Sequence, residues 1–324
     1  MTDRRHPVWF ERPVLPAALQ EVESAATILG PASEDDPHHG LADARAVIAG
    51  AAAFDAQFMD HAPQLRVISR TGIGVDGFDL AAASERVIVV CNAPDAPTIS
   101  TAEHALALLL AVAKNLAKAA AELRRGSRSF YAGHRGIELQ GKTLGLVGYG
   151  RIARRVGALA AGFGMEIQAH DPFLDAAAFA GTRRVGTLEE LVASSDVVSL
   201  HVPLTADNAA LFDAGLFAAM KDGAVFINTA RGGLVDQEAL LQAIDSGKLG
   251  GAGLDVTYPE PLDQGHPLLE RDNIVVTPHI ASATEDGKLR LLLAAFRQAI
   301  QVLDGERPPN IVNPEAWNRE EPIA

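Results

Sequence analysis

Short apolar runs alternate with stretches of helical periodicity along the whole chain. The first series has four β-branched runs, at Thr27–Leu29, Ala46–Ile48, Leu65–Ile68 and Val87–Val90. The second series has six runs, at Thr143–Val147, Met165–Ala169, Asp196–Leu200, Ala224–Asn228, Gly253–Val256 and Ile274–Thr277. Strands that alternate with helices predict parallel sheets joined by crossover helices. The pattern therefore predicts an α/β protein with two doubly wound, parallel-sheet domains.

The segments between and after the two series indicate how the domains are connected. Asn92–Pro97 is rich in turn residues, and the Ala/Leu-rich stretch Thr98–Arg125 predicts one long helix. A last amphipathic helix over Thr284–Leu303 does not continue the second series, so we expect it to carry the chain back to the first domain. A chain of 324 residues also exceeds the usual size of a single core. We predict one domain from residues 1–96 with 292–324, and a second from 97–291.

The composition excludes several classes of function. The net charge of −13 repels polyanions, so we expect neither nucleic acid nor an anionic membrane surface as a partner. The longest clean apolar run, Ala105–Ala113, is too short to cross a bilayer, and the start of the sequence lacks the apolar stretch of a signal peptide. A single cysteine, Cys91, cannot form an internal disulfide. We expect a cytoplasmic protein, and no Cys/His cluster suggests a metal site.

A glycine-rich loop follows the first strand of the second series. Gly148 and Gly150 stand directly after the strand, Ala153 lies in the following helix, and Asp171 ends the next strand. Glycines alone are more often plain turns, but this spacing in a strand–turn–helix context is the dinucleotide fingerprint. Gly148 would make the tight turn and Gly150 would let N–H groups at the helix start approach a pyrophosphate.

Asp171 also predicts which dinucleotide binds. Its carboxylate can accept hydrogen bonds from the adenine ribose but repels a 2′-phosphate, so we predict NAD rather than NADP. Arg183 and Arg184 lie further along the chain, and they could favour NADP only by folding back toward the ribose.

Three further motifs stand at predicted strand ends and contain Arg231, Glu260 and His279. Ligands bind at the carboxyl ends of strands in open α/β sheets. Oxidation of a 2-hydroxy acid requires a base for the hydroxyl proton, a cation for the carboxylate and a group that holds the base; His, Arg and Glu suit these tasks. Each residue alone could be an ordinary surface residue, and only their common placement favours catalysis.

The chain from about Leu65 to Ser282 resembles the D-isomer-specific 2-hydroxyacid dehydrogenase family, which includes phosphoglycerate dehydrogenase. The resemblance rests on GYGRIA with Asp171, SDVVSLHVPLT, KDGAVFINTARGGLVD and the Glu260/His279 pair. It implies that Arg231 binds the substrate carboxylate, that His279 is the acid/base, and that Glu260 bonds His279. It also implies cofactor contacts from Gly148, Gly150, Arg151, Ile152, Asp171, Val202, Pro203, Thr229, Ala230, Asp255, His279 and Ser282.

The resemblance carries further expectations about fold, substrate and assembly. It implies a Rossmann NAD-binding domain inserted into a flavodoxin-like substrate domain, with N–H groups of Gly72, Ile73 and Gly74 facing the substrate. It also implies a homodimer formed through the Thr98–Arg125 helix and the arm Gly126–Gly136, whose His134 or Arg135 could reach the partner's site.

The substrate expected from these features is a small 2-hydroxy or 2-keto acid, as for a glyoxylate/hydroxypyruvate reductase. Relatives of the phosphoglycerate type carry a basic residue where this chain has Ala49–Gly50–Ala51, but D-3-phosphoglycerate dehydrogenase stays an alternative. Formate dehydrogenase resembles the chain less, because it has an amide in place of Glu260. An alternative of another class is an NADH-binding corepressor-like protein, which can retain the same residues.

Overall fold

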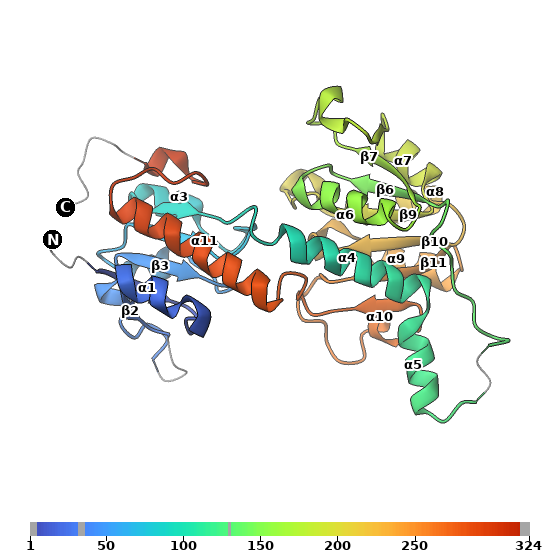
Figure 1. Ribbon diagram of the computed structural model, residues 1–324, viewed down its shortest axis with the longest axis horizontal. Coiled ribbons are helices and arrows are strands. Elements are labelled where there is room, and N and C mark those ends of the chain that lie inside the picture. Colours follow the sequence, from blue (N-terminus) through green and yellow to red (C-terminus); the bar gives the residue numbers. More distant parts are fainter. Residues whose placement is uncertain (1–4, 32–35, 129–130, 318–324) are drawn as a thin grey trace. The chain divides into compact units, whose positions relative to one another are not determined.

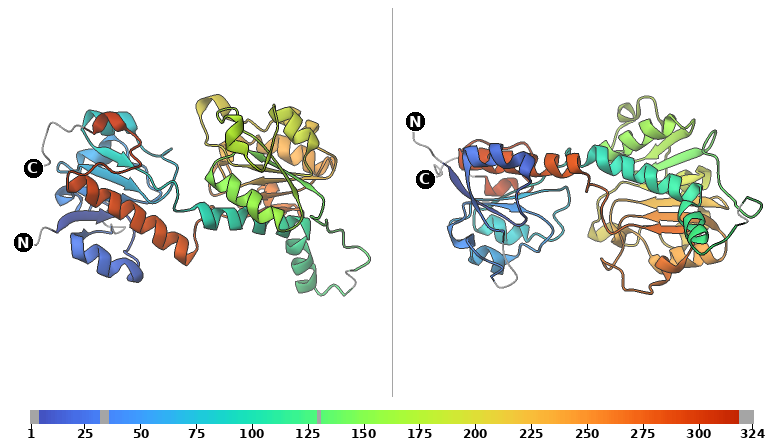
Figure 2. Two further views of the ribbon diagram at one scale, coloured as in Figure 1. Left: turned by 45° about the horizontal axis from the view of Figure 1, so that its top comes forward. Right: turned by 60° about the horizontal axis from the view of Figure 1, so that its bottom comes forward.

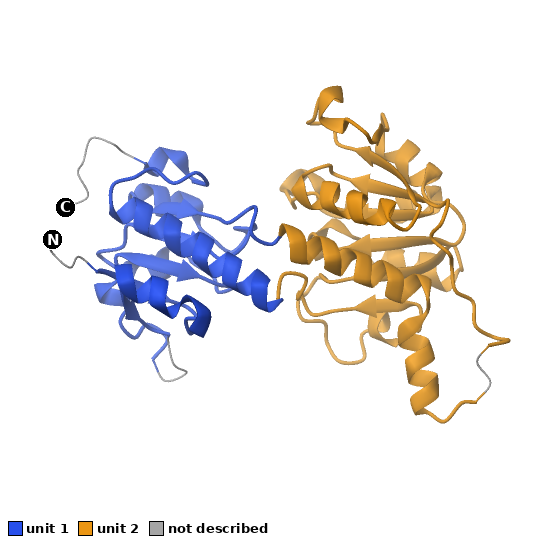
Figure 3. Ribbon diagram, in the orientation of Figure 1, with its two compact units in different colours: residues 1–97, 284–324 blue, residues 98–283 orange. Residues whose placement is uncertain are grey.

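The chain forms two compact units. In the computed structural model, which describes residues 5–31, 36–128 and 131–317, one unit comprises residues 1–97 with 284–324 and the other residues 98–283 (Figure 3). Helix α11, Glu285–Leu303, belongs wholly to the first unit, whereas a boundary at residue 291 would divide it. The hydroxyl of its N-cap, Thr284, accepts a hydrogen bond from Gly287 N. The chain therefore re-enters the first unit at the start of this helix. In the described ranges no helix is long and apolar enough to cross a membrane.

The first unit is built on a five-stranded parallel sheet with the order β2-β1-β3-β4-β5. Its strands are β1 His6–Phe10, β2 Ala26–Leu29, β3 Ala46–Ala49, β4 Val67–Arg70 and β5 Val89–Cys91. This is the flavodoxin-like order, and the chain reverses direction across the sheet between β1 and β3. The pattern of apolar runs had not predicted β1, which is an interior strand of this sheet.

Helices cover both faces of this sheet. Its helices are α1 Leu19–Ala25, α2 Ala56–Asp60, α3 Leu80–Glu85 and α11 (Figure 1). Helix α11 packs on β3, β4 and β5, and its Phe296 stacks on Phe10 at a ring-centroid distance of 6.3 Å. A second apolar cluster, which includes Phe54 and Met59, fills the opposite face. Burial on both faces explains why the strands are continuous apolar runs rather than alternating ones.

The second unit is built on a seven-stranded parallel sheet with the order β12-β11-β10-β9-β6-β7-β8 (Figure 2). Its strands are β6 Thr143–Val147, β7 Glu166–His170, β8 Arg183–Arg184, β9 Val197–Leu200, β10 Ala224–Asn228, β11 Leu249–Leu254 and β12 Ile274–Val276. Counted from β6, the order is that of a Rossmann sheet with one added strand, and its switch point lies between β6 and β9. The predicted fold class, two doubly wound parallel sheets, is confirmed.

The helices of the second unit are also divided between the two faces. They are α4 Thr98–Ala113, α5 Leu116–Arg124, α6 Arg151–Ala161, α7 Leu188–Ser194, α8 Ala214–Ala219, α9 Gln237–Asp245 and α10 Pro267–Glu270. The predicted single helix over Thr98–Arg125 is wrong, because the chain breaks at Asn115, whose φ of 48° is left-handed. Helix α4 packs on α6 and on β10 and β11, whereas none of the residues of α5 is buried.

Candidate active site

The glycine-rich loop joins β6 to α6 at the switch point of the second sheet. Gly148 has a φ of +81°, and a Cβ atom there would lie 2.7 Å from Val202 Cγ1, so only glycine allows this turn. At Gly150 a Cβ atom would meet nothing within 4 Å, and no side chain caps the N-terminus of α6. An open, uncapped helix start of this kind suits a pyrophosphate, because its N–H groups and dipole favour an anion.

Asp171 lies at the end of β7, beside this loop. Its Oδ2 accepts a hydrogen bond from Tyr149 N at 3.0 Å, and its Oδ1 accepts one from Phe173 N at 3.0 Å. The carboxylate is therefore fixed against the glycine loop. The guanidinium of Arg184 lies over the Phe179 ring at 5.3 Å, in contact with that side chain.

The other expected cofactor residues lie at neighbouring strand ends of the same sheet. Arg151 and Ile152 begin α6, Val202 and Pro203 follow β9, and Ser282 lies in the turn after β12. Thr229 and Ala230 follow β10. Thr229 Oγ1 has no hydrogen-bond partner among the described residues, whereas Ala230 N donates to Asn228 Oδ1 at 2.9 Å. The unused hydroxyl of Thr229 is compatible with a further polar partner at this edge.

Arg231 stands on a tight turn after β10. The buried side chain of Asn228 holds this turn, since its Nδ2 donates to Arg231 O at 2.8 Å. The next residue, Gly232, approaches the backbone of Thr257 so closely that a Cβ atom there would lie 2.0 Å from the Thr257 carbonyl. Glycine at 232 therefore brings the Arg231 turn against the segment that carries Glu260.

The segment Thr257–Glu260 is itself held at both ends. Thr257 N donates to Glu260 Oε1 at 3.0 Å, which orients the carboxylate. Gln237, on α9, forms two hydrogen bonds with the backbone of Tyr258. Its Nε2 donates to Tyr258 O at 2.6 Å, and its Oε1 accepts from Tyr258 N at 3.0 Å. The roles of Asn228 and Gln237 were not predicted from the sequence, because their contacts depend on neighbouring turns rather than on a motif of their own.

His279 and Glu260 meet in a hydrogen bond. His279 Nδ1 lies 3.0 Å from Glu260 Oε2, and the side chains are 49% and 38% exposed. Burial raises the pKa of Glu260, but the hydrogen bonds from His279 and Thr257 N and the charges of His279 and Arg231 outweigh it, so this pKa lies below its ordinary value. Glu260 is thus held as an anion beside His279. The three expected catalytic residues lie on adjoining turns.

A buried carboxylate supports the backbone around His279, whose φ of 52° is left-handed. Asp255 Oδ1 accepts from Ile280 N at 2.9 Å and from Thr277 Oγ1 at 2.6 Å, and its Oδ2 accepts from Ala281 N at 2.8 Å. Burial alone would raise the pKa of Asp255. The hydrogen bonds from His104, Thr277, Ile280 and Ala281 outweigh this effect, so the pKa lies below its ordinary value and the carboxylate stays ionised. Both oxygens of this expected cofactor residue therefore already bind the His279 turn.

His104, on α4, completes this network and was missed from the sequence. Its Nε2 lies 2.9 Å from Thr277 Oγ1 and 3.3 Å from Asp255 Oδ1. Because the Thr277 hydroxyl donates its one proton to Asp255, His104 Nε2 must be the donor to Thr277. The only sequence signal was a histidine within an Ala/Leu-rich helix.

A cavity of about 430 Å³ opens beside the turns that carry Glu260 and His279. It is lined by Asp255, Thr257, Glu260, Pro261, Leu262, Leu269, Val276, Thr277, Pro278 and His279. Apolar walls with a few polar groups are typical of small-molecule sites. In the described ranges no group of three or more His, Cys, Asp or Glu side chains could hold a metal ion.

The expected substrate loop lies in the first unit, directly after β4. Thr71 anchors it, since both its N–H and its hydroxyl donate to Ala49 O at 2.9 Å. Carbonyls of the loop are engaged: Ile73 O accepts from Asn92 Nδ2 at 2.8 Å, and Gly74 O from Arg70 Nε at 3.3 Å. No described residue accepts a hydrogen bond from the N–H groups of Gly72, Ile73 or Gly74, so these donors are available to an anion.

The comparison with protein families gives the site its context. Residues 106–281 match the D-isomer specific 2-hydroxyacid dehydrogenase, NAD binding domain. The chain belongs to the D-isomer-specific 2-hydroxyacid dehydrogenase family. The second unit is therefore the NAD-binding domain of this family, which agrees with the Rossmann order of its sheet and with the expected cofactor.

Individual relatives extend the similarity to the first unit. The D-3-phosphoglycerate dehydrogenase of Archaeoglobus fulgidus is 41% identical over 264 residues, which are 80% of this chain and 49% of that protein. The chain thus spans about half the length of the curated relatives it matches. Among solved structures, the TT0316 protein from Thermus thermophilus has a TM-score of 0.86 and 41% identity, covering 94% of this chain and 99% of that one. A glyoxylate reductase from Paecilomyes thermophila has a TM-score of 0.81 and 28% identity, covering 95% and 98%.

Proposed function

We propose that the protein is an NAD-dependent D-2-hydroxyacid dehydrogenase acting on the CH–OH group of a small 2-hydroxy acid, or on the carbonyl of the 2-keto acid in the reverse direction. The hydrogen bond between His279 and Glu260, beside Arg231 and in an NAD-binding domain, carries this proposal. A histidine paired with an ionised carboxylate can both take and give a proton.

Each residue of the set has a defined role in the proposed reaction. Bound NAD(H) supplies or accepts the hydride at substrate C2. Glu260 holds Nδ1 of His279, so Nε2 is the atom left to exchange a proton with the C2 oxygen. Arg231 offers a planar fork of donors to the substrate carboxylate and to that same oxygen. Glu260 stabilises the imidazolium that forms when the hydroxy acid is oxidised.

The proposed cofactor preference is NAD over NADP. Asp171 is fixed beside the glycine loop by two N–H groups, and its carboxylate would face the adenine ribose of a bound dinucleotide. A 2′-phosphate would be repelled there. Arg184 contacts Phe179, which supports leaving this arginine out of cofactor binding.

The proposed substrate is an unphosphorylated 2-keto acid such as glyoxylate or hydroxypyruvate, or the corresponding hydroxy acid. Residues 47–59 contain no Lys or Arg, whereas a phosphate normally calls for a cluster of basic side chains. The second candidate is D-3-phosphoglycerate dehydrogenase activity, which the names of the relatives favour.

A substrate panel tests the proposal. Purified protein is mixed with NADH and, separately, with glyoxylate, hydroxypyruvate, a branched and an aromatic 2-keto acid, and phosphohydroxypyruvate, while the NADH absorbance is followed. We expect consumption of NADH with at least one unphosphorylated acid and less with NADPH. A clear preference for phosphohydroxypyruvate would establish the second candidate. NADH binding without turnover on any acid would instead favour a corepressor-like role.

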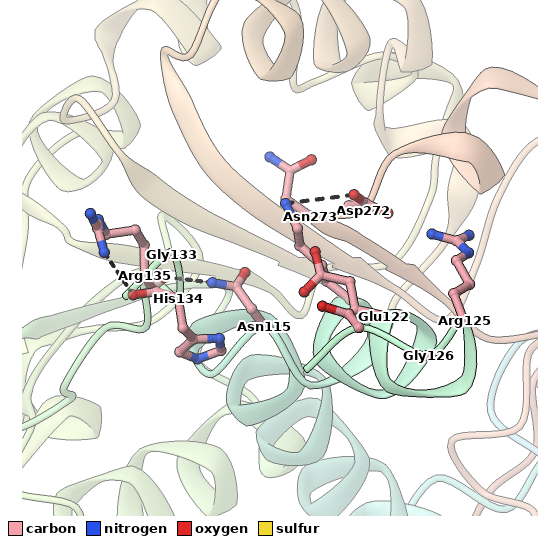
Figure 4. A pocket seen from close by; sticks show the side chains of 11 residues that line it. Asn115, Glu122, Arg125, Gly126, Gly133, His134, Arg135, Asp272 and Asn273 are labelled. Carbon is pink, nitrogen blue, oxygen red and sulfur yellow. Dashed lines mark hydrogen bonds and ion pairs between the residues drawn. The ribbon is translucent and has the colours of Figure 1, made fainter. Parts of the chain in front are cut away.

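We also propose that the protein is a homodimer and acts in the cytoplasm. Helix α5 buries none of its nine residues, yet Leu116 and Leu123, two turns apart on one face, are 54% and 64% exposed. A helix this short is marginal in water unless something packs on it. Beside it, a cavity of about 820 Å³ lies between α5, residues 133–135 and Asp272–Asn273 (Figure 4). A second copy would cover both features.

Light scattering after gel filtration tests the assembly. The wild-type protein should have twice the mass of the chain, and Leu123→Asp should shift it toward the monomer, while Phe163→Asp, at another exposed apolar site on the same unit, should not. A wild-type monomer would contradict this part of the proposal. Ser129 and Phe130 of the expected arm lie outside the described residues.

The cytoplasm is proposed because Cys91, the single cysteine, cannot pair internally.

A further inference from the structure

A carboxylate of the first unit is bound by three consecutive backbone N–H groups. Glu11 follows β1, and its Oε2 accepts from Gly50 N at 2.5 Å. Its Oε1 accepts from Ala51 N at 3.0 Å and from Ala52 N at 3.2 Å. Successive N–H groups that converge in this way form an anion-binding concavity, and here an anion of the protein itself fills it.

This concavity lies where an open α/β sheet binds ligands. The strands β1 and β3 flank the switch point of the five-stranded sheet, and Glu11 and Gly50 follow their carboxyl ends. The loop after β3 also runs beside the proposed substrate loop, because Ala49 O accepts from Thr71 N at 2.9 Å and Phe54 N donates to Gly77 O at 2.9 Å. The Glu11 carboxylate and the free N–H groups of residues 72–74 thus belong to adjoining loops.

The residue at position 50 fits this arrangement. A Cβ atom on Gly50 would lie 2.6 Å from Glu11 Oε1, so a side chain there would displace the carboxylate. A basic side chain at position 50 and the Glu11 carboxylate in its present place therefore exclude each other. The basic residue of the adjoining loop, Arg70, directs its Nε–H to Gly74 O, within the loop proposed to hold the substrate carboxylate.

We propose that Glu11 is a specificity-determining residue, which limits the protein to 2-keto and 2-hydroxy acids whose only anionic group is the C1 carboxylate. The inference rests on the proposed function and names its substrate class. A second anionic group on the substrate, whether phosphate or carboxylate, would be repelled by the Glu11 carboxylate. It could not bind the N–H groups of residues 50–52, because Glu11 already occupies them. Selection then comes from a built-in repulsion as well as from the absence of basic side chains.

The first test uses the wild-type protein and four acids with NADH. Glyoxylate and hydroxypyruvate carry one anionic group, whereas oxaloacetate and phosphohydroxypyruvate carry a second. We expect both acids of the second kind to have a kcat/KM at least roughly tenfold below that of hydroxypyruvate, as like-charge contact weakens binding. Equal or better use of either of these two acids would overturn the inference while leaving the dehydrogenase proposal intact. Failure of all four acids would instead count against the proposed function.

The second test replaces Glu11 by Gln, which keeps the shape and an acceptor oxygen but removes the charge. The ratio of kcat/KM for phosphohydroxypyruvate to that for hydroxypyruvate should rise by roughly tenfold or more, with hydroxypyruvate itself changed less than about twofold. Inorganic phosphate should become a competitive inhibitor of the variant but not of the wild type. An unchanged ratio together with no phosphate inhibition would overturn the inference.

A matched control separates the local charge from the net charge. Glu21→Gln removes a carboxylate of the same unit that pairs with Arg297 on α11, away from the strand ends. It should leave the substrate ratio unchanged; a rise equal to that of Glu11→Gln would overturn the assignment to Glu11. If Glu11→Gln does not fold, Glu11→Asp, which keeps the charge, should restore folding and retain the wild-type ratio. An Asp variant that gains phosphohydroxypyruvate activity would contradict the inference.

Discussion

Glu260→Gln should move the pH dependence of 2-keto acid reduction without abolishing turnover. Reduction requires a protonated His279, and the ionised Glu260 beside it favours that form. A glutamine has a single acceptor oxygen, so with Thr257 N bound to that oxygen its amide N–H can only donate to Nδ1 of a neutral imidazole, and it cannot stabilise the imidazolium. The rate should therefore begin to fall at a lower pH in the variant than in the wild type.

The size of this shift follows from the exposure of the pair. The two side chains are 49% and 38% exposed, so solvent screens their interaction and the free energy is that of a surface pair, about 0.2–1 kcal/mol. Because about 1.36 kcal/mol corresponds to a factor of ten, kcat at the alkaline end of the profile should fall by roughly 1.4- to 5-fold relative to the wild type. The second acceptor bond, from Thr257 N, can persist with glutamine, so the turn itself should stay folded.

The assay is kcat for hydroxypyruvate reduction, at saturating NADH, across the alkaline range. Asp245→Asn serves as the control, because it removes an equivalent charge from an exposed pair with Arg271 in the same unit. Its profile should coincide with that of the wild type. A Glu260→Gln profile that moves to higher pH, or one that does not move, would show that this carboxylate does not tune the histidine.

Two other substitutions test the remainder of the site. Asp171→Ser should weaken NADH binding and raise the NADPH:NADH ratio of kcat/KM by roughly tenfold, through loss of repulsion at the 2′-position; a wild-type preference for NADPH would contradict this. Gly232→Ala places a methyl group against the Thr257 carbonyl and should lower kcat/KM by roughly a hundredfold by misplacing Arg231. Gly186→Ala is its control, because a Cβ atom there would meet only the flexible carboxylate of Glu190, at 3.3 Å; equal effects of the two substitutions would refute this role of Gly232.

Much of the fold was accessible from sequence because both sheets are parallel and buried on both faces. Such strands are unbroken apolar runs separated by helical segments, and all ten predicted runs overlap or adjoin strands of the structure. The convergence of the proposed catalytic residues was accessible for a related reason. Arg231, Glu260 and His279 each follow a strand of one sheet, so their separate motifs converge at one edge.

The features that were missed depend on contacts between distant segments. Strand β1 contains Pro7 and only five residues, and its interior position follows from pairing with β2 and β3 rather than from its own pattern. The predicted long helix breaks because Asn115, within a stretch of good helix formers, adopts a left-handed backbone conformation. His104 contacts Asp255 and Glu11 contacts Gly50, and periodicity carries no information about pairs so far apart in the chain.

The most direct test of the central claim is the comparison of turnover and NADH binding in His279→Asn. General acid/base catalysis typically contributes about 10²–10⁴-fold, so kcat for hydroxypyruvate should fall by that factor. NADH affinity, measured by fluorescence titration, should stay within about threefold of the wild type, because the glycine loop and Asp171 are untouched. A variant that retains most of its kcat would contradict the assignment of His279 as the acid/base.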